Sequence, residues 1–375
     1  MTKPLFVLTE RDLAKLSVMM LLSVILFGLS GLVIMIFLQW ITRQSYAQDS
    51  IDKHGISRVS ASRLGGAAIF ISWLGLLLAG YWSDYFGDAS GGPSGPYWID
   101  WIAVGCCGLL GLVEDLRNNY LSPRCRLYAE FGIFGLAVWV WPVLIPVDLG
   151  IPGLDLLMGL PLIGWLLTVV FCVGFVNSVN MADGANGLMA GVMTIAFSLF
   201  YVSTGEFVYA AMMTACAVFT IFNVISGRLF LGDAGAYGLG ASLAVSGLYL
   251  FYENVFSAAF LACLFSYPCI DFIMTLARRY RAGRSIFLPD NDHLHNRLHY
   301  HFQRWLPSKT LANSLTGGLV VASSSGLTTV GYIYQWWPVT SDLWAWLFLF
   351  QCIGYWIVFY LTGLGRRNFQ YELRL

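Results

Sequence analysis

Acidic, amide and basic side chains gather in four short segments of an otherwise apolar chain. Three of these segments, GLVEDL, FVNSVNMADGANGLMAG and FLGDAGAYGLG, carry the acids Glu114, Asp115, Asp183 and Asp233. The fourth, RRYRAGRSIFLPDNDHLHNRLHYH, holds four of the five histidines and several arginines. Carboxylate oxygens suit Mg²⁺ or Mn²⁺ rather than zinc, and arginine suits the oxygens of phosphates. Together these residues predict a site for a metal ion and a diphosphate.

Glycine is frequent in the same segments. In ADGANG and GDAG the glycines allow backbone N–H groups to approach a phosphate closely. Each feature alone also has an ordinary explanation, since a lone Asp often caps a helix and a basic loop can simply face lipid headgroups. His293 and His295 could be solvated, or could form a zinc pair, although no cysteine lies near them. Only the combination of acids, arginines and glycine loops points to a metal and diphosphate site.

The elements that must position these residues are membrane helices. Of the 375 residues, 58% are hydrophobic and 11% are charged, and the formal net charge is zero. This composition excludes a soluble two-domain enzyme and gives no indication of nucleic-acid binding. A spanning helix needs roughly 20 mainly apolar residues, and eleven such runs are present: 15–39, 64–82, 97–113, 127–147, 157–176, 187–203, 207–225, 236–252, 254–276, 310–335 and 343–364. The sequence predicts an all-α integral membrane protein of about 11 transmembrane helices, forming a single domain over 1–375.

Lysine and arginine are distributed unevenly between the apolar runs. If the loop after the first run lies inside the cell, 18 of the 21 Lys and Arg residues fall in inner segments, and the outer loops after that run hold none. Cytoplasmic loops of membrane proteins carry such an excess of basic residues. The pattern predicts a cytoplasmic C-terminus and places all four polar segments, as catalytic loops, on the cytoplasmic face.

Five blocks, in this order, resemble the polyprenyl-phosphate N-acetylhexosamine-1-phosphate transferase superfamily, of glycosyltransferase family 4 type, over roughly residues 50–300. SRLGGAAIF is similar to the family's PTPRLGG-type block, and GLVEDL is similar to its paired-Asp motif, with Glu114 in the first place. NSVNMADGANG resembles NxxNxxDGxDG with Asn186 for the second Asp, and FLGDAGAY resembles GDxGS with Ala236 for Ser. PCID and the histidine segment resemble the family's P-x-x-D, RR and D-x-x-H-x-H stretch. Eleven spans is the count in the undecaprenyl-phosphate GlcNAc-1-phosphate transferase-like branch.

The resemblance implies a Mg²⁺-dependent phosphotransferase, with Mn²⁺ as an alternative ion. Such an enzyme moves a sugar-1-phosphate from a UDP-N-acetylhexosamine to polyprenyl (undecaprenyl) phosphate, releases UMP, and starts a lipid-linked glycan of O-antigen, teichoic or other cell-envelope type. It implies a multi-pass protein of the inner (plasma) membrane that meets both substrates and membrane lipid, and it leaves a homodimer open. Because both substrates are anionic, attack of one phosphate on the other requires the charge neutralisation that Mg²⁺ and arginines provide.

The resemblance also implies roles for the residues at matching positions. Asp233 is expected to bind Mg²⁺, with Asn180 as a second ligand or a diphosphate contact. Asp115, helped by Glu114, is expected to orient the polyprenyl phosphate, and Asp183 is expected to contact the nucleotide. These three acids are the candidate catalytic residues. The expected substrate-binding residues are Asn177, Asn186, Arg63, Arg281, Arg284, His293 and His295.

Three other functions stay open at this point. A phospho-MurNAc-pentapeptide-type transferase is disfavoured, because Asn118 stands where that branch has a Lys and because the histidines are split in HLHNRLHYH. An ion-coupled transporter would carry acids near the middle of its helices, whereas the acids above lie in inner loops. Glu114, Asn186 and Ala236 suggest a catalytically inactive membrane scaffold as the third. The sequence leaves the donor sugar, the prenyl length and the pathway undetermined.

Overall fold

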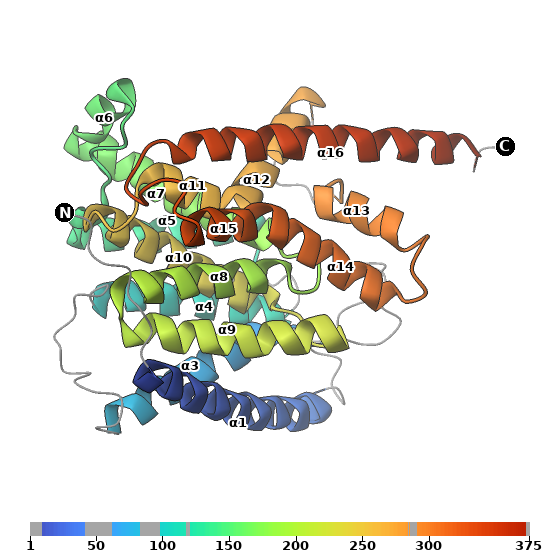
Figure 1. Ribbon diagram of the computed structural model, residues 1–375, viewed down its shortest axis with the longest axis horizontal. Coiled ribbons are helices and arrows are strands. Elements are labelled where there is room, and N and C mark those ends of the chain that lie inside the picture. The colour runs from blue at the N-terminus through green and yellow to red at the C-terminus, as the bar shows by residue number, and fades with distance from the viewer. Residues whose placement is uncertain are drawn as a thin grey trace.

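The computed structural model describes residues 10–41, 62–82, 98–117, 121–283, 285 and 291–372, which fold into a bundle of helices (Figure 1). The helices in chain order are α1 Glu10–Ile41, α3 Gly65–Trp82, α4 Trp98–Arg117, α5 Pro123–Val140, α6 Pro152–Met158, α7 Pro161–Ala182, α8 Leu188–Thr204, α9 Phe207–Ser226, α10 Gly232–Tyr252, α11 Ala258–Leu264, α12 Ser266–Arg281, α13 Leu294–Phe302, α14 Lys309–Val321, α15 Leu327–Ile333 and α16 Trp344–Glu372. Within these ranges β pairing is limited to an isolated parallel bridge between Ser62 and Leu229. The predicted all-α class is confirmed.

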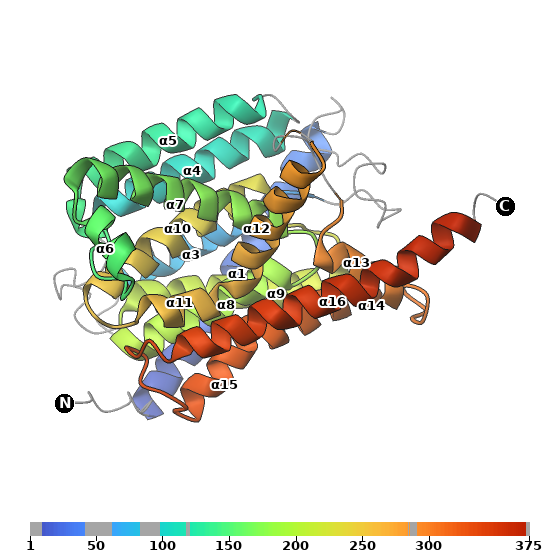
Figure 2. The same ribbon diagram turned by 90° about the horizontal axis from the view of Figure 1, so that it is seen from above.

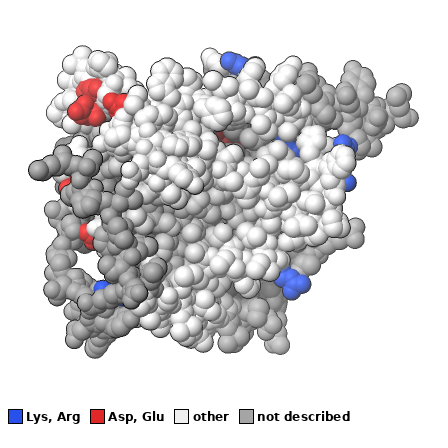
Figure 3. Space-filling view, viewed as in Figure 1, with Lys and Arg blue, Asp and Glu red and all other residues white. Residues whose placement is uncertain are grey.

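Each predicted apolar run overlaps one or more of these helices. Among the described residues, five helical segments are long and apolar enough to cross a membrane: Ala14–Gly31, Pro161–Ala182, Phe207–Ser226, Gly232–Tyr252 and Trp344–Gly363. The bent pair α11 and α12 makes a sixth if it forms one span. The face shown in Figure 3 fits this architecture, because its broad middle is free of charged side chains and an acidic cluster lies at the edge, over α6. The count of about 11 spans stays a prediction.

Two breaks in long apolar segments shape the bundle. The axes of α11 and α12 differ by 80° across Phe265, so α12 crosses the bundle obliquely in Figure 2. Pro268 lies in the first turn of α12, where its missing N–H leaves no helical bond unmade. A π-helical turn over Ala322–Gly326 joins α14 to α15.

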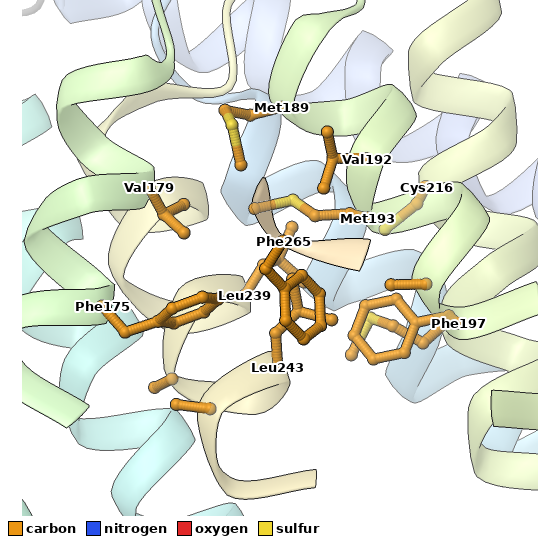
Figure 4. Close-up of a cluster of buried hydrophobic side chains, with 14 of the residues drawn as sticks. Phe175, Val179, Met189, Val192, Met193, Phe197, Cys216, Leu239, Leu243 and Phe265 are labelled. Atoms are coloured by element: carbon orange, nitrogen blue, oxygen red, sulfur yellow. The ribbon is translucent and has the colours of Figure 1, made fainter. Parts of the chain in front are cut away.

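α10 forms the centre of the bundle, and nearly all of its residues are buried. Glycines let neighbouring backbones touch it: a Cβ at Gly111 of α4 would lie 2.1 Å from the carbonyl oxygen of Asp233, and a Cβ at Gly66 of α3 would lie 2.1 Å from the nitrogen of Gly235. Figure 4 shows the apolar core beside it, where side chains of α7, α8, α9 and α10 meet Phe265. The close backbone contacts at Gly111 and Gly66 fix α4 and α3 relative to α10.

The polar segments lie together at one end of the bundle, the end that carries α13, whereas α6 lies at the opposite end (Figures 1 and 2). Backbone bonds join one of them, the GDAG segment, to the SRLGGAAIF block. Ser62 N–H donates to Arg228 at 3.1 Å, and the N–H groups of Gly65 and Gly66 donate to the carbonyls of Phe230 and Leu231 at 3.0 and 2.7 Å. The first predicted block is thereby fixed against the GDAG segment, 170 residues further along the chain.

Candidate active site

Asp115 holds the first turn of α10 at the end of α4. The first N–H groups of a helix have no partner within it, and the Asp115 carboxylate accepts two of them, from Asp233 at 2.9 Å and from Ala234 at 2.8 Å. Gly232 makes this approach possible, because its φ is +72° and a Cβ there would lie 1.9 Å from the carbonyl oxygen of Arg63. Asp115 is fully buried. The structure therefore brings Asp115 and Asp233 together, with Asp115 bound to the Asp233 backbone.

The Asp233 side chain faces α7 and remains partly open. Its Oδ1 accepts a 2.7 Å bond from Nδ2 of Asn180, and 26% of the side chain is exposed. Because the amide nitrogen of Asn180 makes this bond, the carbonyl oxygen is the Asn180 atom that could bind a metal ion. The two residues predicted to bind metal are therefore adjacent in space, although 53 positions separate them in the chain.

Arg126 joins the same cluster, although no motif singled it out. Its Nη1 donates to the Tyr237 hydroxyl at 3.1 Å and lies 3.8 Å from Glu114 Oε2 and 3.9 Å from Asp233 Oδ2. The start of α5 positions it, because Ser122 caps that helix by accepting a backbone N–H at 3.2 Å. The only signal for Arg126 in the sequence is its place among the inner basic residues.

Glu114 supports this cluster from the end of α4. Its Oε1 accepts the backbone N–H of Leu121 at 2.6 Å, and its Oε2 faces Arg126. Only 2% of the residue is exposed. Glu114 therefore links the end of α4 to the start of α5 and orients the Arg126 guanidinium.

Asp183 caps the C-terminal end of α7, three positions after Asn180. Burial and the charge of Asp233 raise the pKa of Asp183 to about 7. The pKa of Asp115 is raised in the same way, and Asp115 too lies outside the membrane-spanning run, which ends at residue 113. Burial and the charge of Asp233 raise the pKa of Asp115 to about 8, although its two backbone hydrogen bonds and Arg63 act to lower that pKa. Ionising all three acids together is therefore unfavourable, and a cation bound beside them would favour their charged forms.

Two buried histidines lie over the ADGANG loop. His293 Nδ1 is 2.5 Å from Asp271 Oδ2, and His295 Nδ1 is 2.8 Å from the Tyr267 hydroxyl. The two rings stack with centroids 5.3 Å apart. A Cβ at Gly184 would lie 2.0 Å from His295 Nε2, so this imidazole packs directly on the loop. Burial lowers the pKa of His295 to about 4, which keeps its ring neutral at pH 7.

Asn177 and Asn186 make bonds that point toward other helices. Asn177 Nδ2 donates to Glu130 Oε2 of α5 at 2.5 Å, and Asn186 Nδ2 donates to the Ser314 hydroxyl of α14 at 3.3 Å. Glu130 is fully buried. The geometry gives both asparagines bonds that fix helices around the site, and their substrate contacts stay predictions.

The three predicted arginines have different placements. Arg63 is half-buried and close enough to Asp115 to favour its charged form. Arg281 is exposed at the end of α12. Arg284 lies outside the described residues.

The donor set at Asp233 fits a hard divalent cation. Among the described residues no group of three or more His, Cys, Asp or Glu side chains could enclose a metal ion. Mg²⁺ does not require one, because it usually binds through one or two protein carboxylates and completes its shell with substrate phosphates and water. Asp233 supplies a partly exposed carboxylate and Asn180 an amide oxygen beside it. The same set is unsuited to a structural zinc site, which needs four closed ligands.

Comparison with known proteins places this geometry among membrane transferases. Residues 97–251, which contain the three clustered acids, match glycosyl transferase family 4. A protein of Bacillus subtilis named "Probable undecaprenyl-phosphate N-acetylglucosaminyl 1-phosphate transferase" is 26% identical over 295 residues, which cover 74% of this chain and 78% of the relative. A phospho-N-acetylmuramoyl-pentapeptide-transferase of Lactiplantibacillus plantarum is 31% identical over 249 residues, 62% of this chain and 75% of the relative. A decaprenyl-phosphate N-acetylglucosaminephosphotransferase of Mycobacterium tuberculosis is 31% identical over 161 residues, 36% of this chain and 40% of the relative.

Proposed function

This chain belongs to glycosyl transferase family 4, and we propose that it transfers an N-acetylhexosamine 1-phosphate from a UDP-sugar to polyprenyl phosphate, with release of UMP. One observation carries the proposal: Asp115 and Asp233 meet at the first turn of α10, Asn180 bonds to Asp233, and Arg126 lies beside them. This cluster lies at the end of helices long enough to cross a membrane. A reaction between a soluble diphosphate and a membrane-bound phosphate requires a site at such a boundary.

We infer that the carboxylate of Asp233 and the amide oxygen of Asn180 hold a Mg²⁺ ion, with Mn²⁺ as a substitute. When bound, the ion neutralises charge on the pyrophosphate oxygens. Asp115 has both oxygens bonded to backbone N–H groups, so we assign it to fixing the direction of Asp233, and its expected contact with polyprenyl phosphate stays a prediction. Asp183 faces the same negative region and is assigned to the nucleotide side.

An oxygen of the acceptor phosphate attacks the sugar-bearing phosphorus of the donor. The bond from that phosphorus to the bridging oxygen breaks, and UMP leaves with that oxygen. No protein base is required, because a phosphate monoester has its second pKa near 6 and is mostly a dianion at pH 7. We assign Arg126 and Arg63 to the acceptor phosphate, since both lie beside Asp115 or Asp233 and both can bind phosphate oxygens in pairs.

The excess of Lys and Arg in alternate loops supports placing this site at the cytoplasmic face of the inner membrane. UDP-sugars are made in the cytoplasm, and the polyprenyl tail stays in the bilayer. His293, His295 and Arg281 then lie on the donor side of the site, beyond the ADGANG loop.

A UDP-N-acetylhexosamine without a peptide is the proposed donor. The Bacillus subtilis relative described above supports this donor, because its name specifies an N-acetylglucosaminyl 1-phosphate and its match covers 74% of this chain and 78% of the relative. A UDP-MurNAc-pentapeptide is the second candidate, because several relatives of 24–31% identity carry the corresponding name. A donor comparison separates the two.

The test is an assay of purified protein in detergent with labelled UDP-GlcNAc, polyprenyl phosphate and Mg²⁺. We expect labelled lipid and an equal amount of UMP from the wild type, and neither product from Asp233→Asn, which keeps the size of the side chain but removes its charge. UDP-MurNAc-pentapeptide is expected to give no product. Absence of UMP with every UDP-N-acetylhexosamine and with the pentapeptide donor would refute the proposal.

A further inference from the structure

A buried chain of hydrogen bonds connects the C-terminal helix α16 to the histidine segment. The hydroxyl of Tyr355, on α16, donates to Asp271 Oδ1 at 2.6 Å, while Oδ2 of the same carboxylate lies 2.5 Å from His293 Nδ1. The backbone N–H of Leu294 adds a longer bond to Asp271, at 3.2 Å. Tyr355 and Asp271 are 6% and 1% exposed. One carboxylate on α12 therefore ties α16 to the residue that precedes α13.

The Asp271 carboxylate sets the tautomer of His293. An ionised carboxylate only accepts hydrogen bonds, so the proton of this pair lies on Nδ1 of the ring and Nε2 becomes the atom available to other groups. Without the Tyr355 hydroxyl, Asp271 Oδ1 would keep only the longer bond from Leu294. The carboxylate, and with it the orientation of the His293 ring, would then be held less tightly.

The second ring carries this order to the loop that bears Asp183. His295 stacks on His293 with 5° between the ring planes, and Tyr267 bonds both its Nδ1 and its backbone N–H. Its Nε2 side packs on Gly184 with no room for a Cβ. A shift of His293 therefore reaches the ADGANG loop through direct contacts.

A second set of contacts joins the same two elements. The Arg297 guanidinium lies 3.6 Å from the centroid of the Phe359 ring and donates to the Phe359 carbonyl oxygen at 2.6 Å. Arg297 also forms a paired bond with Asp292, at 2.7 and 2.8 Å, and His301 bonds to the Thr362 carbonyl at 3.1 Å. Tyr355, Phe359 and Thr362 follow each other on α16 at spacings of four and three, so one face of the helix contacts α12 at Asp271 and α13 at Arg297 and His301.

We propose that Tyr355 is a positioning residue: through Asp271 it fixes His293 and His295 over the ADGANG loop, and α16 thereby completes the donor side of the site. Its kinetic consequence rests on the proposed function, whereas its structural consequence does not. α16 lies outside the segment 97–251 that matches the family, so this role does not follow from the shared motifs.

The test uses the full-length protein in detergent and the variant Tyr355→Phe, which removes one hydroxyl and nothing else. Tyr360→Phe is the matched control, because Tyr360 lies on the same helix and is 57% exposed. We expect Tyr355→Phe to raise the KM for UDP-GlcNAc about tenfold, with the KM for polyprenyl phosphate unchanged and only a small decrease of the thermal midpoint from the lost 2.6 Å bond. Unchanged donor KM, or an equal loss in all three quantities, would overturn the proposal, since the first shows no role and the second shows only general destabilisation.

A readout that needs no turnover separates this proposal from the proposed function. Diethyl pyrocarbonate modifies accessible imidazoles, and peptide mass spectrometry measures its rate at each histidine. We expect faster modification of His293 in Tyr355→Phe than in wild type, with the rate at His301 unchanged. If the wild type makes no labelled lipid, the proposed function fails while this comparison still decides the positioning role. Equal His293 rates in the two proteins would overturn it.

Discussion

Replacing Gly232 by alanine should separate the two acids that define the site. Gly232 precedes Asp233, has a φ of +72°, and leaves no room for a side chain: a Cβ would lie 1.9 Å from the Arg63 carbonyl oxygen and 2.7 Å from Asp115 Oδ2. The left-handed conformation costs an L-residue roughly 1–2 kcal/mol. Relief of the overlap requires a backbone shift, at roughly 1–3 kcal/mol more. The expected destabilisation of Gly232→Ala is therefore about 2–5 kcal/mol.

Gly205→Ala is the matched control. Gly205 has nearly the same φ, +75°, but it follows the C-terminal end of α8, and nothing lies within 4 Å of the added Cβ. It should therefore lose only the roughly 1–2 kcal/mol of the conformational cost. The comparison isolates the contact with Asp115 and Arg63 from the effect of a positive φ.

Thermal unfolding in detergent and the lipid-transfer assay measure the two consequences. We expect the thermal midpoint of Gly232→Ala to lie below that of Gly205→Ala, and we expect transfer activity to be lost only in Gly232→Ala, because the N–H groups of Asp233 and Ala234 then move away from Asp115. Equal midpoints and equal activities in the two variants would refute the packing argument on which the site is built.

Three further outcomes are expected. Arg126→Ala should raise the KM for polyprenyl phosphate at least tenfold, whereas Tyr237→Phe, which removes only the 3.1 Å bond to Arg126, should change it less than fivefold, by about 1 kcal/mol or less; steady-state kinetics with varied acceptor distinguishes them. Burial lowers the pKa of His295 from 6.5 to about 4, so the unfolded chain binds this proton at a higher pH than the folded chain, and the free energy of unfolding falls below pH 6.5, by about 1.4 kcal/mol at pH 5.5. The difference between the thermal midpoints at pH 7.5 and pH 5.5 should therefore be smaller in His295→Gln than in the wild type. An identical difference in the two proteins would contradict the burial argument. Asn186→Ala should lower the midpoint by loss of the Ser314 bond, roughly 1 kcal/mol, while keeping kcat; a lost kcat with an unchanged midpoint would instead indicate the predicted substrate contact.

The helices and the grouping of motifs could be predicted because both depend on local properties of the sequence. An apolar run of membrane length has few alternatives to a helix, since its backbone groups must bond internally. Loops that alternate along such runs must lie at one end of the bundle, and this brought Asp115, Asn180 and Asp233 together as expected.

The side-chain directions could not be predicted, because they depend on which helix packs against which. Arg126 belongs to no motif, and it reaches Asp233 only because α5 begins beside α4. Asn186 lies within a motif, yet its amide turns to α14. The bond from Tyr355 to Asp271 joins positions 84 apart. None of these contacts leaves a periodic or compositional signal in the chain.

Binding of Mn²⁺ in the presence of UDP-GlcNAc, followed by electron paramagnetic resonance, tests the metal and diphosphate site most directly. We predict one bound Mn²⁺ for each wild-type chain and at least a tenfold weaker affinity in Asp233→Asn, with Asp155→Asn, on α6 at the opposite end of the bundle, binding like the wild type. Equal Mn²⁺ affinity in Asp233→Asn and in the wild type would contradict the account.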